Sequence, residues 1–364
     1  MQIREPTVSE ERFIEELRAQ VEDVLLVSDA SLRQGGQAAL FSGRLLWDAE
    51  TAFSLLHERL KAKGLLPFLQ RRRGQDSVLI VPAPQEKGKP RPIINLLLFV
   101  ATILTTLFVG AFNEGFNPLE NPATLKFGIP FASALLLILG THELSHYFVA
   151  QRHGLRVSLP YFIPVPFGLG TFGAFIRMES VAKDRKGFFD VGLAGPLAGL
   201  AIAIPVLILG LSLSEVKPII HGPGYITEGN SLLYLTLKYI VHGQILPSRG
   251  VDVFLHPVAF AGWIGLMITG VNLLPAGQLD GGHVAYALLG GAYKWVAQLV
   301  LLLLMGLGLF LWSGWLLWAL LILLSGPRHP RPLNDITGVG GKRKVIGILA
   351  LILLLTIFTP VPFS

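Results

Sequence analysis

The sequence predicts a polytopic α-helical membrane protein with a small soluble α+β domain at its N-terminus and a membrane-associated β-hairpin. Hydrophobic residues make up 52% of the 364 residues and charged residues only 15%, whereas an ordinary soluble domain is about 25% charged. The mean hydropathy is +0.58. After residue 92, apolar runs recur that are long enough to cross about 30 Å of hydrocarbon. Folding alone cannot keep so much apolar surface away from water.

Residues 1–91 are predicted to form a cytoplasmic soluble α+β domain and its linker. Segments 9–27 and 47–64 have helical spacing, and the second ends at Gly64. The stretches "QAALFSGRLL" and "DSVLIVPAP" are typical of strands, and basic, proline-rich "PAPQEKGKPRP" follows as a linker. This domain holds no catalytic constellation in its sequence. A role in recognition or regulation and a purely structural role both stay open.

Residues 92–364 are predicted to form a transmembrane domain of about six or seven spans. The apolar runs lie at 93–112, 127–150, 188–213, 257–280, 295–326 and 345–363. The run 295–326 is too long for one comfortable span and is either a hairpin or one strongly tilted helix. The run 257–280 is broken by Pro275 and Gly277, and segment 231–245 carries Lys238 and His242, which favours an interfacial helix.

Loop charges predict the orientation. Basic residues gather in the linker, in the loop after the second span and in segment 326–344, whereas the loop between the first two spans is mildly acidic. Cytoplasmic loops carry the excess of Lys and Arg, so the N-terminal domain is expected in the cytoplasm, and seven spans satisfy this orientation. The net charge of +6 suits anionic lipid headgroups rather than nucleic acid. No signal peptide is visible, and the expected location is the cell membrane.

The stretch "GTHELSHYFVAQ", residues 140–151, places ionisable groups inside an apolar run. His142 and His146 are four residues apart, so a helix puts both imidazoles on one face. Glu143 can touch a water on an ion held there without being a ligand, which is the arrangement that zinc hydrolysis requires. Packed histidines and a proton relay are the alternatives. Each such group in a span costs about 3 kcal/mol, which favours a metal site.

The stretch "NLLPAGQLDGGH", residues 272–283, offers the best third ligand. The chain has no cysteine, so a metal must be held by His, Asp or Glu. Asp280 is a carboxylate at or near membrane depth, and Pro275 and Gly277 break the helix before it, which lets a short side chain reach another helix. The amide of Asn272 could donate to a developing oxyanion or could join two helices.

These paired motifs resemble the site-2 protease family of intramembrane zinc metalloproteases (M50-type). The motif residues present are His142, Glu143, His146, Asn272, Pro275, Leu279, Asp280 and Gly281. The resemblance implies one zinc ion per chain bound by His142, His146 and Asp280, with Glu143 as general base and later proton donor. It extends over a catalytic core at about 127–290. The N-terminal domain, "FNPLENP" and "RHPRPLND" are similar to the EGY-like branch of plant plastids and prokaryotes.

Between the two motifs, "LPYFIPVPFGLGTFGAFIRMES" (159–180) has alternating apolar residues bounded by Gly and Pro, which predicts a β-hairpin. Its edge could pair with an unwound substrate; a hairpin without substrate contact is the alternative. The candidate substrate-binding residues are Thr171, Phe172, Gly173, Ala174 and Phe175.

Other motif residues receive structural interpretations. Gly192, Gly195 and Gly199 are predicted to permit close helix packing. His256 and His283 could support the metal ligands or be plain interfacial histidines. The remaining histidines are expected at the surface, namely His57, His153, His221, His242 and His329.

The function that these features favour is an endopeptidase that cleaves membrane-anchored proteins in or near their spanning helices, with the lipid bilayer as its other partner. A divalent-metal transporter is an alternative, since intramembrane His and Asp also build ion paths. A transporter has no need of Glu143, and the sequence shows no inverted repeats. A catalytically inactive relative that binds membrane proteins is the third class. The oligomeric state is not indicated by the sequence.

Overall fold

The computed structural model describes residues 8–33, 37–72, 74–84, 91–219, 227–326 and 329–363. His221 lies outside these ranges. The chain divides into two compact units. Unit 1 comprises Met1–Lys89, Val181–Phe188 and Pro330–Val339, and unit 2 comprises Pro90–Ser180, Phe189–His329 and Gly340–Ser364.

Unit 1 contains a four-stranded antiparallel sheet in the order β1-β2-β4-β3. Its elements are α1 (Val8–Arg18), β1 (Leu25–Arg33), β2 (Ala38–Leu45), α2 (Ala49–Lys61), β3 (Leu65–Arg72) and β4 (Gln75–Pro82). Asp48 caps α2 by accepting from the backbone N–H groups of Glu50 and Thr51. Apolar residues of the helices, of the strands and of the turn between α1 and β1 share one core, which includes Val21, Phe41 and Leu56.

The predicted helices and two strands of unit 1 are present as α1, α2, β2 and β4. One prediction was wrong: the helix expected at 9–27 ends at Arg18, and Leu25 begins β1. The segment 25–27 is apolar enough to continue a helix, but its backbone pairs with β2, and sheet pairing overrides local spacing. β3 was not predicted from the sequence, because it contains Pro67, and proline is tolerated in a sheet only at an edge strand such as this one.

Two segments from far along the chain complete unit 1. Leu69 on β3 donates its N–H to the carbonyl of Leu333, and Asp335 donates its N–H back to the carbonyl of Leu69. The two segments are joined by the N–H of Asn334, which donates to the carbonyl of Lys183. We call Val181–Phe188 and Pro330–Val339 the two straps. Unit 1 is therefore larger than the N-terminal stretch before the linker.

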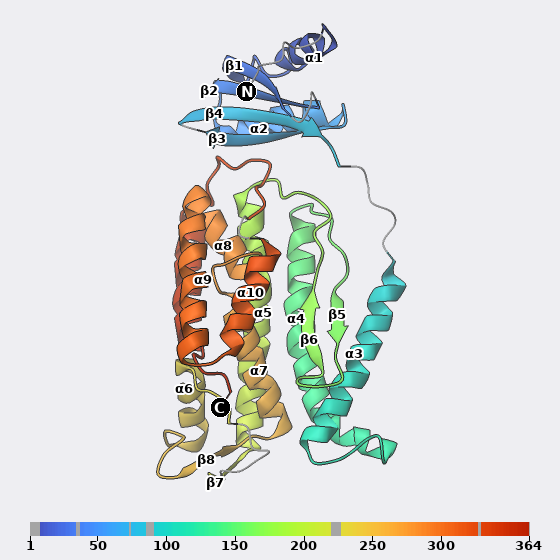
Figure 1. The fold of residues 1–364 in the computed structure, drawn as a ribbon, viewed down its shortest axis with the longest axis vertical. Coiled ribbons are helices and arrows are strands. Elements are labelled where there is room, and N and C mark those ends of the chain that lie inside the picture. Colours follow the sequence, from blue (N-terminus) through green and yellow to red (C-terminus); the bar gives the residue numbers. More distant parts are fainter. Residues whose placement is uncertain are drawn as a thin grey trace. The chain divides into compact units, whose positions relative to one another are not determined.

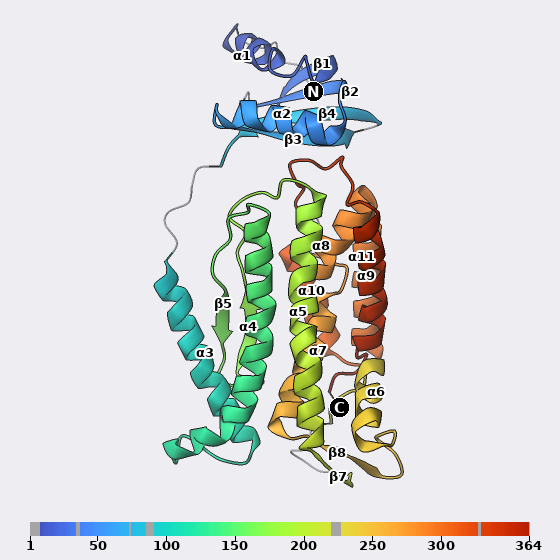
Figure 2. The ribbon, with the colours of Figure 1, turned by 180° about the vertical axis from the view of Figure 1, so that it is seen from behind.

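Unit 2 is built from apolar helices that run side by side along its length (Figures 1 and 2). They are α3 (Pro92–Asn113), α4 (Ile129–Arg152), α5 (Arg185–Ser212, whose first residues belong to unit 1), α6 (Leu232–His242), α7 (Pro257–Asn272), α8 (Asp280–Leu289), α9 (Tyr293–Phe310), α10 (Gly314–Ser325) and α11 (Gly341–Ile357), with short 3-10 helices η2 (Pro122–Gly128) and η3 (Gly290–Ala292). Within the described ranges, four helical stretches are long and apolar enough to cross a membrane: Pro92–Asn113, Pro122–Arg152, Arg185–Ser212 and Asp280–Phe310. The predicted fold class is confirmed.

The two irregular apolar runs are resolved by the structure. Run 295–326 is a helical hairpin, α9 followed by α10 with a turn at 311–313. Run 257–280 is interrupted, because α7 ends at Asn272 and α8 begins only at Asp280. Lys238, whose charge suggested an interfacial helix, is fully buried on α6, and its Nζ donates to Asp252 Oδ1 at 3.2 Å. Its charge is therefore satisfied inside the protein.

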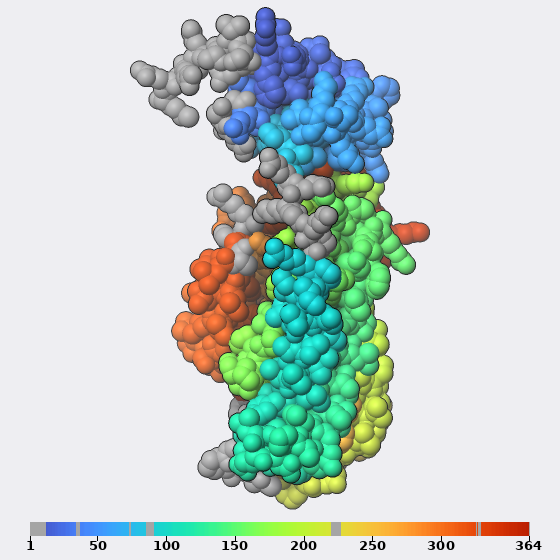
Figure 3. Space-filling model, turned by 90° about the vertical axis from the view of Figure 1, so that its right-hand side faces the viewer, coloured from blue at the N-terminus to red at the C-terminus, as the bar shows by residue number. Residues whose placement is uncertain are grey.

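The predicted β-hairpin is present as antiparallel strands β5 (Tyr161–Pro164) and β6 (Thr171–Phe175). The side chain of Asn95 on α3 donates to the backbone carbonyls of Leu159 and Pro160. α3 forms the face of unit 2 that Figure 3 shows. A second short ladder joins β7 (Glu215–Pro218) and β8 (Val251–Phe254).

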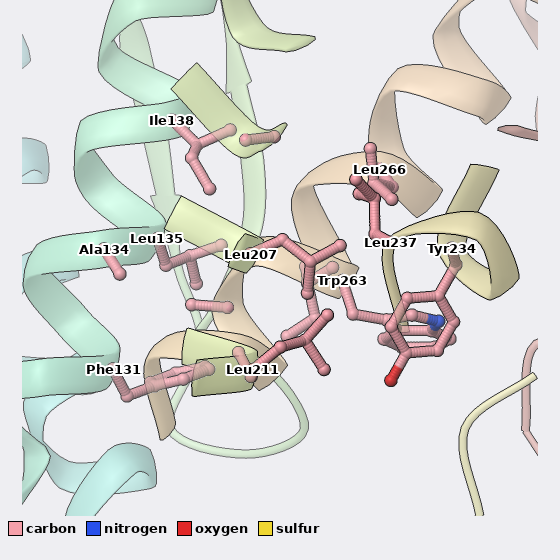
Figure 4. Packing of buried hydrophobic residues seen from close by; sticks show 14 of the residues in the cluster. Phe131, Ala134, Leu135, Ile138, Leu207, Leu211, Tyr234, Leu237, Trp263 and Leu266 are labelled. Atoms are coloured by element: carbon pink, nitrogen blue, oxygen red, sulfur yellow. The ribbon is translucent and has the colours of Figure 1, made fainter. Parts of the chain in front are cut away.

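The core of unit 2 lies where α4, α5, α6 and α7 meet (Figure 4). Leu135 of α4 and Leu207 of α5 are fully buried, and Trp263 of α7 is 1% exposed. The Trp263 indole N–H donates to the carbonyl of Gly229, so this large ring is buried with its polar group satisfied. This packing holds α4, α5 and α7 together, and each of them contributes to the site described next.

Candidate metal centre

α4 presents the first two predicted ligands on one face. His142 and His146 are 3% and 5% exposed, and their Nε2 atoms lie 3.1 Å apart. Glu143, between them in the sequence, is also buried, with 5% exposed. The helical spacing that the sequence indicated therefore brings two imidazoles together and keeps a carboxyl group beside them.

The orientation of His146 is fixed from α5. Its Nδ1 donates a hydrogen bond to the backbone carbonyl of Val191 at 2.7 Å. With the proton on Nδ1, the lone pair is on Nε2, which faces His142 and Asp280. A backbone carbonyl thus selects the tautomer that a metal ligand requires.

Asp280 is the first residue of α8 and reaches both rings. Its Oδ2 lies 3.2 Å from His142 Nε2 and 3.3 Å from His146 Nε2. Of the described residues, His142, His146 and Asp280 form the one His, Asp and Glu group placed to hold a metal ion, with ligand atoms all within 4.8 Å of one another. Their ligand role stays a prediction, but the structure brings them together.

The donor set fits zinc. Two neutral imidazoles and one carboxylate are the ligand types of hydrolytic zinc sites, where a fourth position is left for water or substrate. Asn272, the last residue of α7, reaches the same place, with its Nδ2 3.3 Å from His142 Nε2. The amide is therefore at the centre, as its predicted role requires.

Glycines on α5 leave room for the two histidines. A Cβ built at Gly195 would overlap Nε2 of His146, and one at Gly199 would lie 3.1 Å from Nδ1 of His142. The small-residue pattern thus does permit close packing, and the packing partner is the metal centre itself. The sequence pattern indicated close contact but not which helix would make it.

The candidate substrate-binding residues of β6 differ in accessibility. Phe172 and Phe175 are 72% and 48% exposed, whereas Thr171 is 4% exposed. The hydroxyl of Thr171 donates to the carbonyl of Ile163 and also accepts from the N–H of Gly173. Any contact of Thr171 with a substrate would therefore have to involve its backbone. Gly173 and Ala174 are half-buried, and their predicted role is unchanged.

One of the histidines expected at the surface is buried, and His57, His153 and His242 are half-buried. His329 was expected at the surface but is 7% exposed, and its Nε2 lies 2.6 Å from Nδ1 of His283. His283 follows Asp280 by one turn of α8. His256, in contrast, caps α7 by accepting from the N–H of Val258. No signal in the sequence distinguishes His329 from an exposed histidine in a loop, because its partner His283 lies far away along the chain.

A search of family models matches residues 130–312 to peptidase family M50, about half of the chain. The chain belongs to peptidase family M50. The match includes every residue of the candidate metal centre, and it confirms the resemblance to the site-2 proteases.

Curated relatives confirm the EGY-like assignment. The probable zinc metalloprotease EGY2, chloroplastic, of Arabidopsis thaliana is 29% identical over 371 residues, covering 96% of this chain and 65% of the relative. The probable zinc metalloprotease EGY1, chloroplastic, of the same plant is 30% identical over 374 residues, covering 90% and 66%. The rice protein of that name (Oryza sativa subsp. japonica) is 29% identical over 372 residues, covering 89% and 63%. This M50 chain therefore spans just under two thirds of these relatives. Their names lend no support to the expected location in the cell membrane.

Proposed function

We propose that this chain is a zinc-dependent endopeptidase that hydrolyses peptide bonds in or near the spanning helices of membrane-anchored proteins. The observation that carries the proposal is the meeting of His142, His146 and Asp280, from two apolar helices, beside the buried carboxyl group of Glu143. One ion per chain is the stoichiometry that a single group of three ligands supports.

The chain's own groups would do the following. Zinc, when bound, would polarise a peptide carbonyl and make a water molecule more acidic. Glu143 takes the proton from the attacking water and returns it to the nitrogen of the leaving amine. Asn272 donates its amide N–H to the carbonyl oxygen as negative charge develops there. His146 is held in the correct tautomer by the Val191 carbonyl.

The substrate has to be partly unwound before cleavage. A helix in lipid keeps its carbonyls in internal hydrogen bonds, which shields the peptide bond. The exposed side chains of Phe172 and Phe175 on β6 support this hairpin as the element that pairs with an extended substrate. The basic loops support an orientation with the N-terminal domain in the cytoplasm.

Glu143→Gln tests the proposal. Wild type and variant would be purified in detergent and offered a synthetic spanning peptide with a helix-breaking residue at its centre. We expect cleavage to fall by about 10²–10⁴-fold, the usual contribution of a general base, while zinc remains bound. Chelation should abolish cleavage by the wild type, and added zinc should restore it.

The alternatives give different results in the same experiment. A metal transporter would move zinc into lipid vesicles. Neither the wild type nor Glu143→Gln would then cleave the peptide. An inactive relative would bind the peptide but not cleave it, with or without zinc. The M50 match favours the protease over the transporter, and the grouped ligands with Glu143 beside them favour it over an inactive relative. Equal cleavage by wild type and Glu143→Gln would contradict the proposal.

A further inference from the structure

His329 is enclosed by aromatic rings next to the metal centre. Its ring stacks on Tyr286 with centroids 4.4 Å apart and an interplanar angle of 11°. Tyr293 approaches the same ring edge-on at 5.7 Å. The third neighbour is His283, joined to His329 by the 2.6 Å hydrogen bond between ring nitrogens. A ring packed on three sides and hydrogen-bonded is held in one position.

One of these neighbours also holds the turn that precedes Asp280. The hydroxyl of Tyr293 donates to the carbonyl of Gly277 at 2.8 Å, within the break between α7 and α8. A Cβ at Gly282 would lie 3.1 Å from the same hydroxyl. Tyr293 therefore contacts both the turn and the first turn of α8, the two stretches that flank Asp280.

His283, the neighbour that hydrogen-bonds His329, lies on α8, and its position therefore depends on the rotation of that helix. His283 follows Asp280 by three residues, so the two side chains project from nearly the same face of the helix. A Cβ at Gly192 on α5 would lie 2.8 Å from His283 Cβ and 2.9 Å from the Asp280 carbonyl. Because α5 packs this closely, a rotation of α8 that moves His283 also moves Asp280.

We propose that His329 is a positioning residue for the metal centre: through His283 and Tyr293 it fixes the rotation of α8 and so aims the Asp280 carboxylate at His142 and His146. This inference rests on the metal site of the proposed function. It assigns a task to a histidine that is not one of the three predicted ligands. Its consequence is measured as metal affinity and does not require the protein to cleave anything.

The experiment measures Co²⁺ and Zn²⁺ binding to the full chain in detergent, by competition with a chelator. Partners behind metal ligands typically contribute 10–100-fold in affinity, and His329→Ala is expected at the lower end, about tenfold weaker. His329→Gln can still hydrogen-bond His283 and should recover part of the loss. The absorption spectrum of bound Co²⁺, which reports ligand geometry, should change in His329→Ala and return towards wild type in His329→Gln.

Two further variants make the test decisive. His242→Ala removes a half-buried histidine from α6, at the other end of unit 2 from α8 (Figure 1), and should leave metal affinity unchanged. Tyr293→Phe removes only the hydroxyl that bonds the Gly277 carbonyl and should also weaken binding. If His329→Ala does not fold, His329→Phe takes its place, since it keeps an aromatic ring but cannot hydrogen-bond His283. Thermal unfolding of the metal-free proteins separates a general loss of stability from a specific loss of affinity.

The inference would be overturned if His329→Ala, or His329→Phe in its place, kept the metal affinity and Co²⁺ spectrum of the wild type. An equal loss of affinity in His242→Ala would also overturn it. The outcome is separable from that of the proposed function. If Glu143→Gln leaves cleavage unchanged while His329→Ala weakens metal binding, the protease proposal fails and the positioning role stands. If cleavage depends on Glu143 but metal affinity does not change in the His329 variants, the positioning role alone fails.

Discussion

Gly195 lies at the point on α5 that is packed against the ring of His146, and it has no side chain there. A Cβ at this position would overlap the imidazole Nε2, the atom predicted to bind metal. Position 195 therefore constrains the metal centre, although it contributes no chemistry. Neighbouring Gly199 leaves slightly more room, since its Cβ would meet His142 Nδ1 at 3.1 Å.

Gly195→Ala is expected to weaken zinc binding by about tenfold or more, because the added methyl group must push His146 out of its orientation. Gly306→Ala on α9 is the matched control, since no neighbouring element of the described chain comes within 4 Å of a Cβ there. Chelator competition on both variants, with thermal unfolding of the metal-free forms, measures the effect. Equal zinc affinity in the two variants would contradict the prediction.

The sequence indicates the ligands better than what orients them. His142 and His146 follow from helical spacing, and Asp280 from the cost of a carboxylate at membrane depth. The acceptor that orients His146 is the backbone carbonyl of Val191, and an apolar residue name gives no sign of it. His329 was missed for a related reason: its partner His283 is 46 residues away along the chain.

At the scale of elements, the turn between β5 and β6 is packed directly on α3. Gly170 has φ +79°, and a Cβ there would lie 2.6 Å from the Cα of Thr106. The hydroxyl of Thr105 donates to the Gly170 carbonyl at 2.7 Å. At Gly168, in the same turn with φ +63°, no atom of the described chain other than those of its two neighbours in sequence lies within 4 Å of a Cβ. The two glycines share a backbone conformation but not a packing contact.

Gly170→Ala should move the hairpin away from α3, whereas Gly168→Ala introduces similar backbone strain without a clash. We expect faster amide exchange across β5 and β6 and a lower kcat/KM for a spanning peptide in Gly170→Ala only. Zinc affinity should be the same in both, because the ligands lie elsewhere. A matching effect of both variants would show that backbone strain, not contact with α3, is responsible.

Elements with a strong local signal are those that the sequence identified. The hairpin followed from alternation bounded by Gly and Pro, and the break after α7 from Pro275 and Gly277. β1 and β3 were missed although each pairs with the next strand along the chain, because the apolar start of β1 continues the helical spacing before it and Pro67 interrupts the strand pattern of β3. For run 295–326, length alone left two arrangements open, and the observed hairpin bends at 311–313.

At the scale of the whole chain, unit 1 is closed by the two straps. Arg185 Nε donates to Asp335 Oδ1 at 2.8 Å, and the side chains are 18% and 12% exposed. These residues are 150 positions apart, which is why composition and linker signals placed the boundary of the domain at residue 91 alone. The first strap also leads directly into α5, and Val191 follows it by three residues.

Breaking this pair should loosen unit 1 at the straps. Arg185→Ala or Asp335→Ala leaves a partly buried charge without this partner, and hydrogen bonds to charged groups contribute about 1.5–3 kcal/mol. Amide exchange in Val181–Phe188, Pro330–Val339 and β3 should rise accordingly, and the charge swap Arg185→Asp with Asp335→Arg should reverse part of the rise. Arg18→Ala is the control, because the Arg18–Glu22 pair lies in the same unit with side chains 45% and 59% exposed. Such exposed pairs contribute about 0–1 kcal/mol. Equal exchange in the Arg18 and Arg185 variants would show that the straps are held by their backbone pairing with β3 alone.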